Sequence, residues 1–272
     1  MNYILKPMIF IYCIHLLLGC VSTTEGGQVG LERKQLLLVS SEEIESQSGK
    51  AYDQVKLEAQ QKKQLDRNSS QVYRVQKIAN RIVPHVGVFR QDSLNWKWEV
   101  HVQTSDELNA YCMPGGKMMF YSGLIDKLSL TDSEIAAIMG HEMAHALREH
   151  GREKMSEQII KVGLIQLGVE SGMIKENYAG ALMALSEMMI GLPHSRGQES
   201  EADVIGLELM ARAGFDPRDA VSLWKKMSSG GGSKPPEFIS THPSDENRIK
   251  NIQSVLSRVL PIYLNSQNGN TR

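Results

Sequence analysis

The spacing of apolar residues divides the chain into helical and extended segments. Residues 41–81 are rich in charge and carry apolar positions at helical spacing, so we expect two amphipathic helices there. The period changes to two at residues 96–104, where tryptophan and valine alternate with polar residues, and this predicts a half-buried strand. A Pro-Gly-Gly turn at residues 114–116 precedes a second predicted strand at residues 117–121. We expect these two strands to pair in a small antiparallel sheet.

The later part of the sequence is predominantly helical. Thr131 and Glu134 fit a capping box, which predicts a helix start, and Gly151 is expected to mark the end of that helix. Further helices are expected at residues 153–169, 176–190, 195–212, 217–228 and 244–259. The pattern as a whole predicts an α+β fold with many helices and one small sheet.

The first twenty residues are typical of a bacterial export signal. Lys6 precedes an apolar run, residues 8–18, which is too short to span a bilayer comfortably. A buried helix or a short membrane anchor is the alternative. The run ends in Leu-Leu-Gly-Cys, which resembles the lipobox of bacterial lipoproteins. That resemblance implies cleavage before Cys20 and lipidation of its thiol, and multiple acyl chains anchor a protein stably. Because Val21 replaces the aspartate that retains such proteins in the inner membrane, we expect the outer membrane, facing the periplasm.

These features divide the chain into four parts. We expect a signal peptide at residues 1–19, a lipidated polar tether at 20–40, one folded domain at 41–264 and a polar tail at 265–272. With 30 basic and 31 acidic residues, the chain has no charge excess that would indicate a nucleic-acid partner. Of three cysteines, Cys112 is alone in the expected mature chain apart from the lipidated one, so no internal disulfide is expected. We interpret Cys112 as a packed small residue.

The strongest chemical signal is the sequence His141-Glu142-Met143-Ala144-His145 inside the predicted capped helix. Residues four apart lie on one face of a helix, so both imidazoles can bind one Zn²⁺ ion. Glu142 can then reach a water molecule at the metal and act as the general base. A catalytic zinc needs a third protein ligand and one open position.

The third ligand is predicted downstream. A histidine at the spacing of the extended H-E-x-x-H-x-x-G-x-x-H motif is missing, because residue 151 is glycine, and we expect His150 to be a surface residue. Glu199 and Asp203 are four residues apart on one helix face. We predict Glu199 as the zinc ligand and Asp203 as the acceptor that fixes the tautomer of a ligand imidazole. Glu201 points away from this face and is expected to be solvated. His85 and His101 are expected on the surface and His194 in a structural role.

These motifs together resemble a known group of zincin metallopeptidases. H-E-x-x-H, followed by S-R-x-x-E-x-x-A-D at residues 195–203, is similar to the CAAX prenyl proteases, the heat-shock protease HtpX and the periplasmic proteases BepA and LoiP. The last two are the most similar, because the other members have transmembrane helices. The resemblance covers about residues 41–260 and includes N-A-x-x-x-P-G-G at residues 109–116. It implies a predominantly helical zincin-like domain with a small antiparallel sheet beside the metal helix.

The same resemblance assigns two further parts of the site. In zincins the substrate binds as an added strand, and the predicted strand for this is formed by Lys117, Met118, Met119, Phe120 and Tyr121. His242, in the H-P-x-x-x-x-R segment that ends at Arg248, is expected near the zinc. We predict that it is either a hydrogen-bond donor to the tetrahedral intermediate or a fourth ligand that closes the site.

The function expected from this set is a zinc endopeptidase with one zinc per chain. Its substrates would be misfolded or stalled envelope proteins, as in protein quality control. Two alternatives remain open. One is a chaperone or assembly factor that acts mainly by binding, with latent protease activity. The other is a zinc hydrolase that acts on cell-wall peptides.

Overall fold

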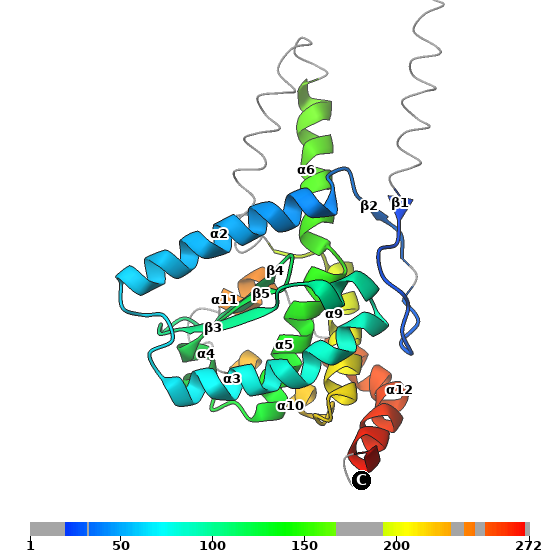
Figure 1. Cartoon of the computed structure of the whole chain (residues 1–272). Helices are drawn as coiled ribbons and strands as arrows, with labels where there is room; N and C mark the ends of the chain where they lie inside the picture. Colours follow the sequence, from blue (N-terminus) through cyan, green and yellow to red (C-terminus); the bar gives the residue numbers. More distant parts are fainter. Residues whose placement is uncertain (1–19, 32, 167–192, 230–236, 243–247, 270–272) are drawn as a thin grey trace, which may run out of the picture.

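The computed structural model describes residues 20–31, 33–166, 193–229, 237–242 and 248–269 (Figure 1). The predicted signal peptide and the helix expected at residues 176–190 lie outside these residues. Within them, long helices pack around a small three-stranded sheet, and a second sheet consists of two short strands, which confirms the predicted α+β class. No helix among the described residues is long and apolar enough to cross a membrane.

The sheet has three strands and is mixed rather than purely antiparallel. β3 (Glu99–Gln103), β5 (Lys117–Tyr121) and β4 (Ala110–Met113) lie side by side in that order. β4 and β5 form an antiparallel hairpin, whereas β3 runs parallel to β5. The predicted antiparallel pairing of the segments at 96–104 and 117–121 is therefore wrong in direction. The chain reverses once more between them, through β4, which alternation in the sequence did not reveal.

The hairpin turn depends on its glycines. Gly115 and Gly116 have φ angles of +77° and +78°, a region that residues with a Cβ rarely adopt. A Cβ on Gly116 would also lie 2.6 Å from the Trp98 ring. The Pro-Gly-Gly sequence therefore sets both the turn and the close approach of Trp98.

Helices cover both faces of the sheet. α2 (Ser41–Gln61) packs on one face, where Tyr52 is buried with Tyr111 and Met119. α3 (Ser69–Ile82) packs on the other face together with the helix of the H-E-x-x-H motif. The two amphipathic helices predicted for residues 41–81 are confirmed. The alternating side chains of β5 thus enter two different clusters.

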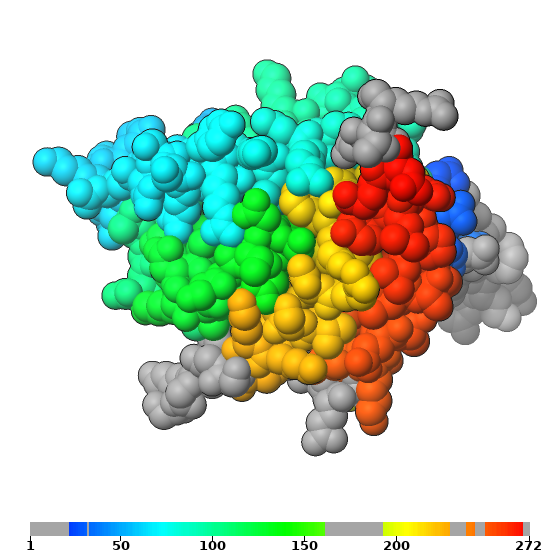
Figure 2. All heavy atoms as spheres, turned by 90° about the horizontal axis from the view of Figure 1, so that it is seen from below, coloured from blue at the N-terminus to red at the C-terminus, as the bar shows by residue number. Residues whose placement is uncertain are grey.

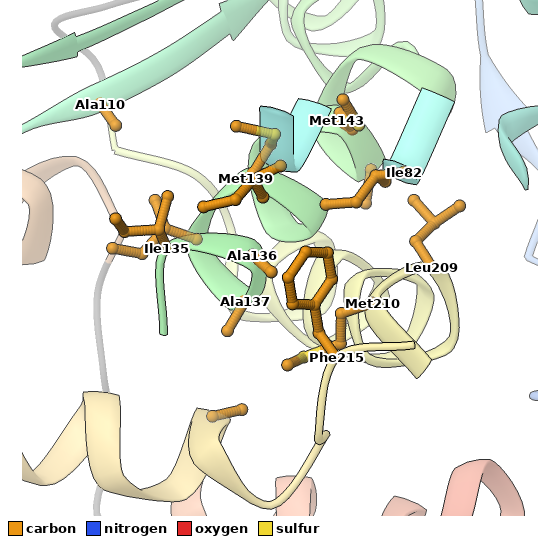
Figure 3. Close-up of a cluster of buried hydrophobic side chains, with 14 of the residues drawn as sticks. Ile82, Ala110, Ile135, Ala136, Ala137, Met139, Met143, Leu209, Met210 and Phe215 are labelled. Carbon is orange, nitrogen blue, oxygen red and sulfur yellow. The ribbon is translucent and has the colours of Figure 1, made fainter. Parts of the chain in front are cut away.

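The helical part is built around α5 (Asp132–Leu147) and α9 (Arg196–Arg212), which pack directly against each other. Their apolar side chains, including Met139 and Met210, form the middle of the core (Figure 3). α10 (Asp219–Ser229) contacts α5, and α12 (Arg248–Gly269) packs along α9. In Figure 2 the orange-red and red surface of α12 lies against the yellow surface of α9. The remaining helical elements are α4 (Ser122–Lys127), α6 (His150–Gln166), α11 (Glu237–Thr241) and the 3-10 helices η1 (Val83–Val88) and η2 (Gln91–Asn95).

Two helix ends differ from the sequence prediction. α5 ends at Leu147, and Glu149 takes a φ of +52°, so Gly151 lies inside the next helix, α6. Buried Glu149 is held in this turn by Arg90 and Arg152. At the C-terminus α12 continues to Gly269, so most of the segment expected to be a polar tail is helical. Gln267 on this helix donates to the carbonyl of Gly214.

Residues 20–40 differ from the polar tether that we expected. Two short strands, β1 (Cys20–Val21) and β2 (Gln35–Leu36), pair antiparallel beside α6 (Figure 1). Val29 is buried, and the backbone N–H groups of Gln28 and Val29 donate to Glu208 Oε2 in α9. The described part of this segment is therefore packed on the domain, because Val29, Leu37 and Val39 are buried and several of its polar groups bond to the helices.

Candidate metal centre

The helix that carries His141, Glu142 and His145 has a well-defined start. Thr131 Oγ1 accepts from the backbone N–H of Glu134 at 3.2 Å, and Glu134 Oε2 accepts from the backbone N–H of Thr131 at 2.9 Å. This is the predicted capping box. Glu134 is itself held by Lys226 and Ser222 of α10. The start of α5, nine residues before His141, is thus fixed in place.

Four side chains bring possible ligand atoms together in the interior. His141 Nε2 lies 3.1 Å from His145 Nε2, and Glu199 Oε1 lies 3.3 Å from His145 Nε2. His242 Nδ1 lies 3.2 Å from His141 Nε2 and 3.1 Å from Glu199 Oε1. The ligand atoms of these four residues all lie within 4.8 Å of one another, and all four side chains are buried. The structure therefore gathers the three predicted ligands and His242 at one point.

Glu142 lies beside this point. Its Oε1 is 3.4 Å from His242 Nε2, and among the described residues this buried oxygen has no hydrogen-bond partner. Burial raises the pKa of Glu142, while His242 and His141 oppose the shift. A carboxylate with a free, buried oxygen and a raised pKa suits a general base, because it can accept a proton and later release it.

Asp203 and Arg248 support the cluster from the side of α9 and α12. Asp203 Oδ1 lies 3.0 Å from His141 Nδ1, so the Nδ1–H donates there and Nε2 is left to face the cluster. Arg248 joins Asp203 at 2.7 Å to Glu199 Oε2 at 2.8 Å and stacks over the Trp224 ring. Burial alone would lower the pKa of His141, but Glu199 and Asp203 outweigh it and raise the pKa to about 9.

Two residues that we expected at the surface are buried beside His145. His150 is fully buried, with its Nδ1 2.8 Å from His145 Nδ1 and its Nε2 3.0 Å from Glu201 Oε2. Glu201 also pairs with Arg148 and Arg33. Glu201 does face away from the metal side of α9, as expected. It is buried nevertheless, because α6 and the N-terminal segment cover that side of the helix. Burial lowers the pKa of His150, although Glu201 opposes the shift.

A pocket opens onto the cluster between β4 and α5. It is lined by the cluster residues Glu142, His145 and His242, by Gly151, His194 and Thr241, and by residues 109–112. β4 is thus the strand beside the site. β5, predicted as the substrate strand, lies in the middle of the sheet with β3 and β4 on its two sides. It cannot pair with a substrate, because both of its edges are already occupied, and this prediction is corrected.

The other cysteine and histidine residues considered in the sequence lie outside the four-residue cluster. Cys112 is buried, as predicted, and burial raises the pKa of its thiol well above the usual value, which keeps it protonated. His194 lines the pocket and its ring lies 3.9 Å from the His145 ring, centroid to centroid. His101 is half-buried, with Nδ1 2.5 Å from Asp66 Oδ2, and His85 is half-buried too, so neither is an ordinary surface residue.

The donor set fits a zinc ion. Two imidazole nitrogens and a carboxylate oxygen are a set used by catalytic zinc sites, in which one position stays open. The outward nitrogens of both predicted imidazole ligands have partners that fix their orientation, Asp203 for His141 and His150 for His145. His242 is the fourth donor within reach. These residues could hold a metal without any change of fold.

Sequence comparisons agree with this geometry. The model of peptidase family M48 matches residues 69–256. The mitochondrial metalloendopeptidase OMA1 of Arabidopsis thaliana is 35% identical over 176 residues, which cover 64% of this chain and 35% of the relative. The human OMA1 metalloendopeptidase is 34% identical over 177 residues, 61% of this chain and 33% of the relative.

A bacterial relative is more distant. The β-barrel assembly-enhancing protease of Escherichia coli is 25% identical over 201 residues, which cover 71% of this chain and 40% of the relative. The matches span only about a third to two fifths of these relatives' own lengths. The family match runs from the start of α3 into the first part of α12 and includes all the residues of the candidate metal centre. The chain belongs to peptidase family M48.

Proposed function

We propose that this chain is a zinc metalloendopeptidase with one zinc per chain. The observation that carries the proposal is the convergence of His141 Nε2, His145 Nε2 and Glu199 on one point, next to Glu142 Oε1, which has no hydrogen-bond partner in the described part of the chain. The OMA1 relatives are named as metalloendopeptidases, which supports the same reaction class. His141, His145 and Glu199 are the proposed ligands, and Asp203 orients His141.

The side chains divide the work of peptide hydrolysis. A bound zinc supplies an acidified water and polarises the carbonyl of the substrate. Glu142 Oε1 takes the proton of the attacking water and passes it to the leaving amine, and its raised pKa matches both steps. His242 Nε2 faces Glu142, so it can donate to the oxyanion, whereas its Nδ1 can act as a fourth ligand that closes the site.

We propose β4 as the strand along which the substrate binds. The carbonyl of Asn109 accepts from the N–H of Tyr121 in β5, so main-chain groups of the alternate residues 110 and 112 point to the other edge. There the N–H of Ala110 donates only to the neighbouring Asn109 Oδ1, at 2.9 Å, which a substrate carbonyl would replace. That edge belongs to the pocket with Glu142. The far edge of β3 is less available, since Asp66 bonds to Val102 there. An extended peptide would therefore add to β4.

Hydrogen exchange can test this substrate position. A peptide substrate added to the inactive Glu142→Gln chain should slow exchange of the amides at residues 110–113 and leave those of β3 unchanged. Protection of β3 with no change at β4 would contradict the proposed strand.

For the cellular role we propose an outer-membrane lipoprotein, anchored through lipid on Cys20, that degrades misfolded or stalled envelope proteins. The lipobox-like sequence at residues 17–20 supports the anchor. The name of the Escherichia coli relative, a protease that enhances β-barrel assembly, fits an envelope role, whereas the OMA1 relatives are named as mitochondrial. Labelling with radioactive palmitate tests the anchor: wild type should carry label and Cys20→Ala should not. Label that persists in the variant would refute it.

The reaction is tested with the full chain purified in detergent. We expect about one zinc per chain and cleavage of casein but not of isolated muropeptides. Cleavage of muropeptides instead would favour the cell-wall hydrolase. If zinc binds and no protein substrate is cleaved, the His242→Ala variant decides between a closed site and a binding protein. Activity that appears in this variant indicates a fourth ligand, and continued inactivity favours a chaperone or assembly factor.

A further inference from the structure

The outer nitrogen of His145 begins a chain of contacts that leads away from the metal centre. His145 Nε2 faces the other ligands, so Nδ1 carries the proton and donates to His150 Nδ1 at 2.8 Å. That bond leaves the proton of His150 on Nε2, which donates to Glu201 Oε2 at 3.0 Å. Each hydrogen-bond donor in this chain of three residues therefore meets an acceptor, and no two donors face each other.

Glu201 is held in turn by two arginines. Buried Arg148 donates from Nε to Glu201 Oε2 at 3.0 Å, and Arg33 donates from Nε to Glu201 Oε1 at 2.5 Å. Arg33 also forms a two-pronged contact with Glu153 of α6. Two guanidinium groups on one carboxylate fix its plane, because each offers a rigid set of donors.

The other partners of Arg148 come from the N-terminal segment, residues 20–31 and 33–40. Its guanidinium donates to Thr24 Oγ1 at 2.7 Å, to Ser22 Oγ at 3.3 Å and to the carbonyl of Arg33 at 3.0 Å. Gln35, from the same segment, donates to the backbone carbonyl of Arg148 at 2.6 Å. The segment that precedes the family-matched residues thus surrounds the arginine that holds Glu201.

We infer that His150 and Glu201 are positioning residues for the metal ligand His145, and that the N-terminal segment, through Arg33 and Arg148, is part of this support. His141 has Asp203 and Arg248 in the same role on the other side of the site. Each imidazole ligand is thus oriented by a carboxylate that is held by arginine. Asp203 orients His141 directly, whereas Glu201 orients His145 through His150. This inference rests on the proposed zinc function.

The test measures how fast zinc leaves the full chain when a chromophoric chelator is in excess. His150→Phe keeps a planar aromatic ring but removes both hydrogen bonds, and it leaves Glu201 paired with its arginines. We expect release about 10–100 times faster than from wild type, and a changed visible spectrum of the cobalt-substituted chain. His150→Gln, which can both accept and donate, should restore most of the wild-type behaviour.

Arg33→Ala tests the link to the N-terminal segment. Arg33 is 40% exposed, so its loss should leave the fold intact and speed release by several-fold, less than His150→Phe. Arg74→Ala is the matched control, because Arg74 is 35% exposed and pairs with Asp132 at the start of the same metal helix. It should release zinc at the wild-type rate.

The outcomes separate the two proposals. A wild-type chain that binds no zinc would overturn the proposed function and this inference with it. A wild type that binds zinc, beside a folded His150→Phe variant with unchanged release and an unchanged cobalt spectrum, would overturn the positioning role alone. Equal zinc-release rates for Arg33→Ala and Arg74→Ala would show that the N-terminal segment does not help to position His145.

Discussion

Gly140 of α5 and Gly206 of α9 lie in backbone contact where the two helices cross. A Cβ on Gly140 would lie 2.7 Å from the carbonyl oxygen of Gly206, and a Cβ on Gly206 would lie 2.7 Å from the amide nitrogen of His141. Distances this short require the backbones to move apart. The crossing therefore sets how closely the helix of His141 and His145 approaches the helix of Glu199 and Asp203.

Replacing Gly206 with alanine should separate these helices. We expect the free energy of unfolding of the metal-free chain to fall by about 1–3 kcal/mol, measured by urea denaturation, with weaker zinc binding as well. Gly49→Ala is the control, since a Cβ there in α2 meets nothing within 4 Å and alanine favours a helix. That variant should be unchanged or more stable. A Gly206→Ala chain as stable as wild type would show that the crossing tolerates a methyl group.

The pH dependence of stability should report on Glu134, which caps the metal helix. Burial alone would raise its pKa, but Lys226, the N–H of Thr131 and Ser222 together lower it. Since the folded pKa lies below the unfolded one, the carboxylate stabilises the fold above about pH 4.3 and loses this effect as the pH falls through the folded pKa.

Glu134→Gln should therefore reduce the free energy of unfolding at pH 7 by about 1–3 kcal/mol, with a smaller deficit at acid pH. Urea titrations at pH 7 and below pH 4 measure both values. Glu58→Gln, at an exposed position of α2, is the control and should change little at either pH. An equal deficit for Glu134→Gln at both pH values would show that the charge of Glu134 is not what stabilises the cap.

Arg248 offers a test of the support around His141. It holds Glu199 with one nitrogen and Asp203 with the other, and lies 3.5 Å from the Trp224 ring centroid. A lysine keeps the charge but cannot make the forked contact or the stacking. Arg248→Lys should weaken zinc binding about 10–100-fold, measured by competition with a chelator. Unchanged affinity would mean that the charge alone suffices.

The sequence indicated which residues would lie together in the candidate metal centre because their spacing is local. His141 and His145, and likewise Glu199 and Asp203, share a helix face by the helical period alone, and the helices around them were predicted within a few residues. The family motifs then placed these two pairs, and His242, at one site. The H-P-x-x-x-x-R motif singled out Arg248, but the family resemblance did not predict which residues Arg248 contacts.

What the sequence could not show depends on tertiary contacts. All four residues of β4 are buried, so the strand has no alternation to detect, and the parallel pairing of β3 with β5 follows from it. His150 and Glu201 were expected to be exposed because each was judged on its own helix, whereas their partners lie on another helix or in the N-terminal segment. That segment has the composition of a linker and yet fills buried polar positions.

The proton-transfer role of Glu142 is the central claim, and one comparison tests it directly. Glu142→Gln replaces the carboxylate with an amide of the same shape, and Glu142 is not among the proposed ligands. The account predicts that this variant binds the same zinc as wild type, about one per chain, while its casein cleavage falls by at least about a hundredfold. Cleavage at the wild-type rate with equal zinc content would contradict the account.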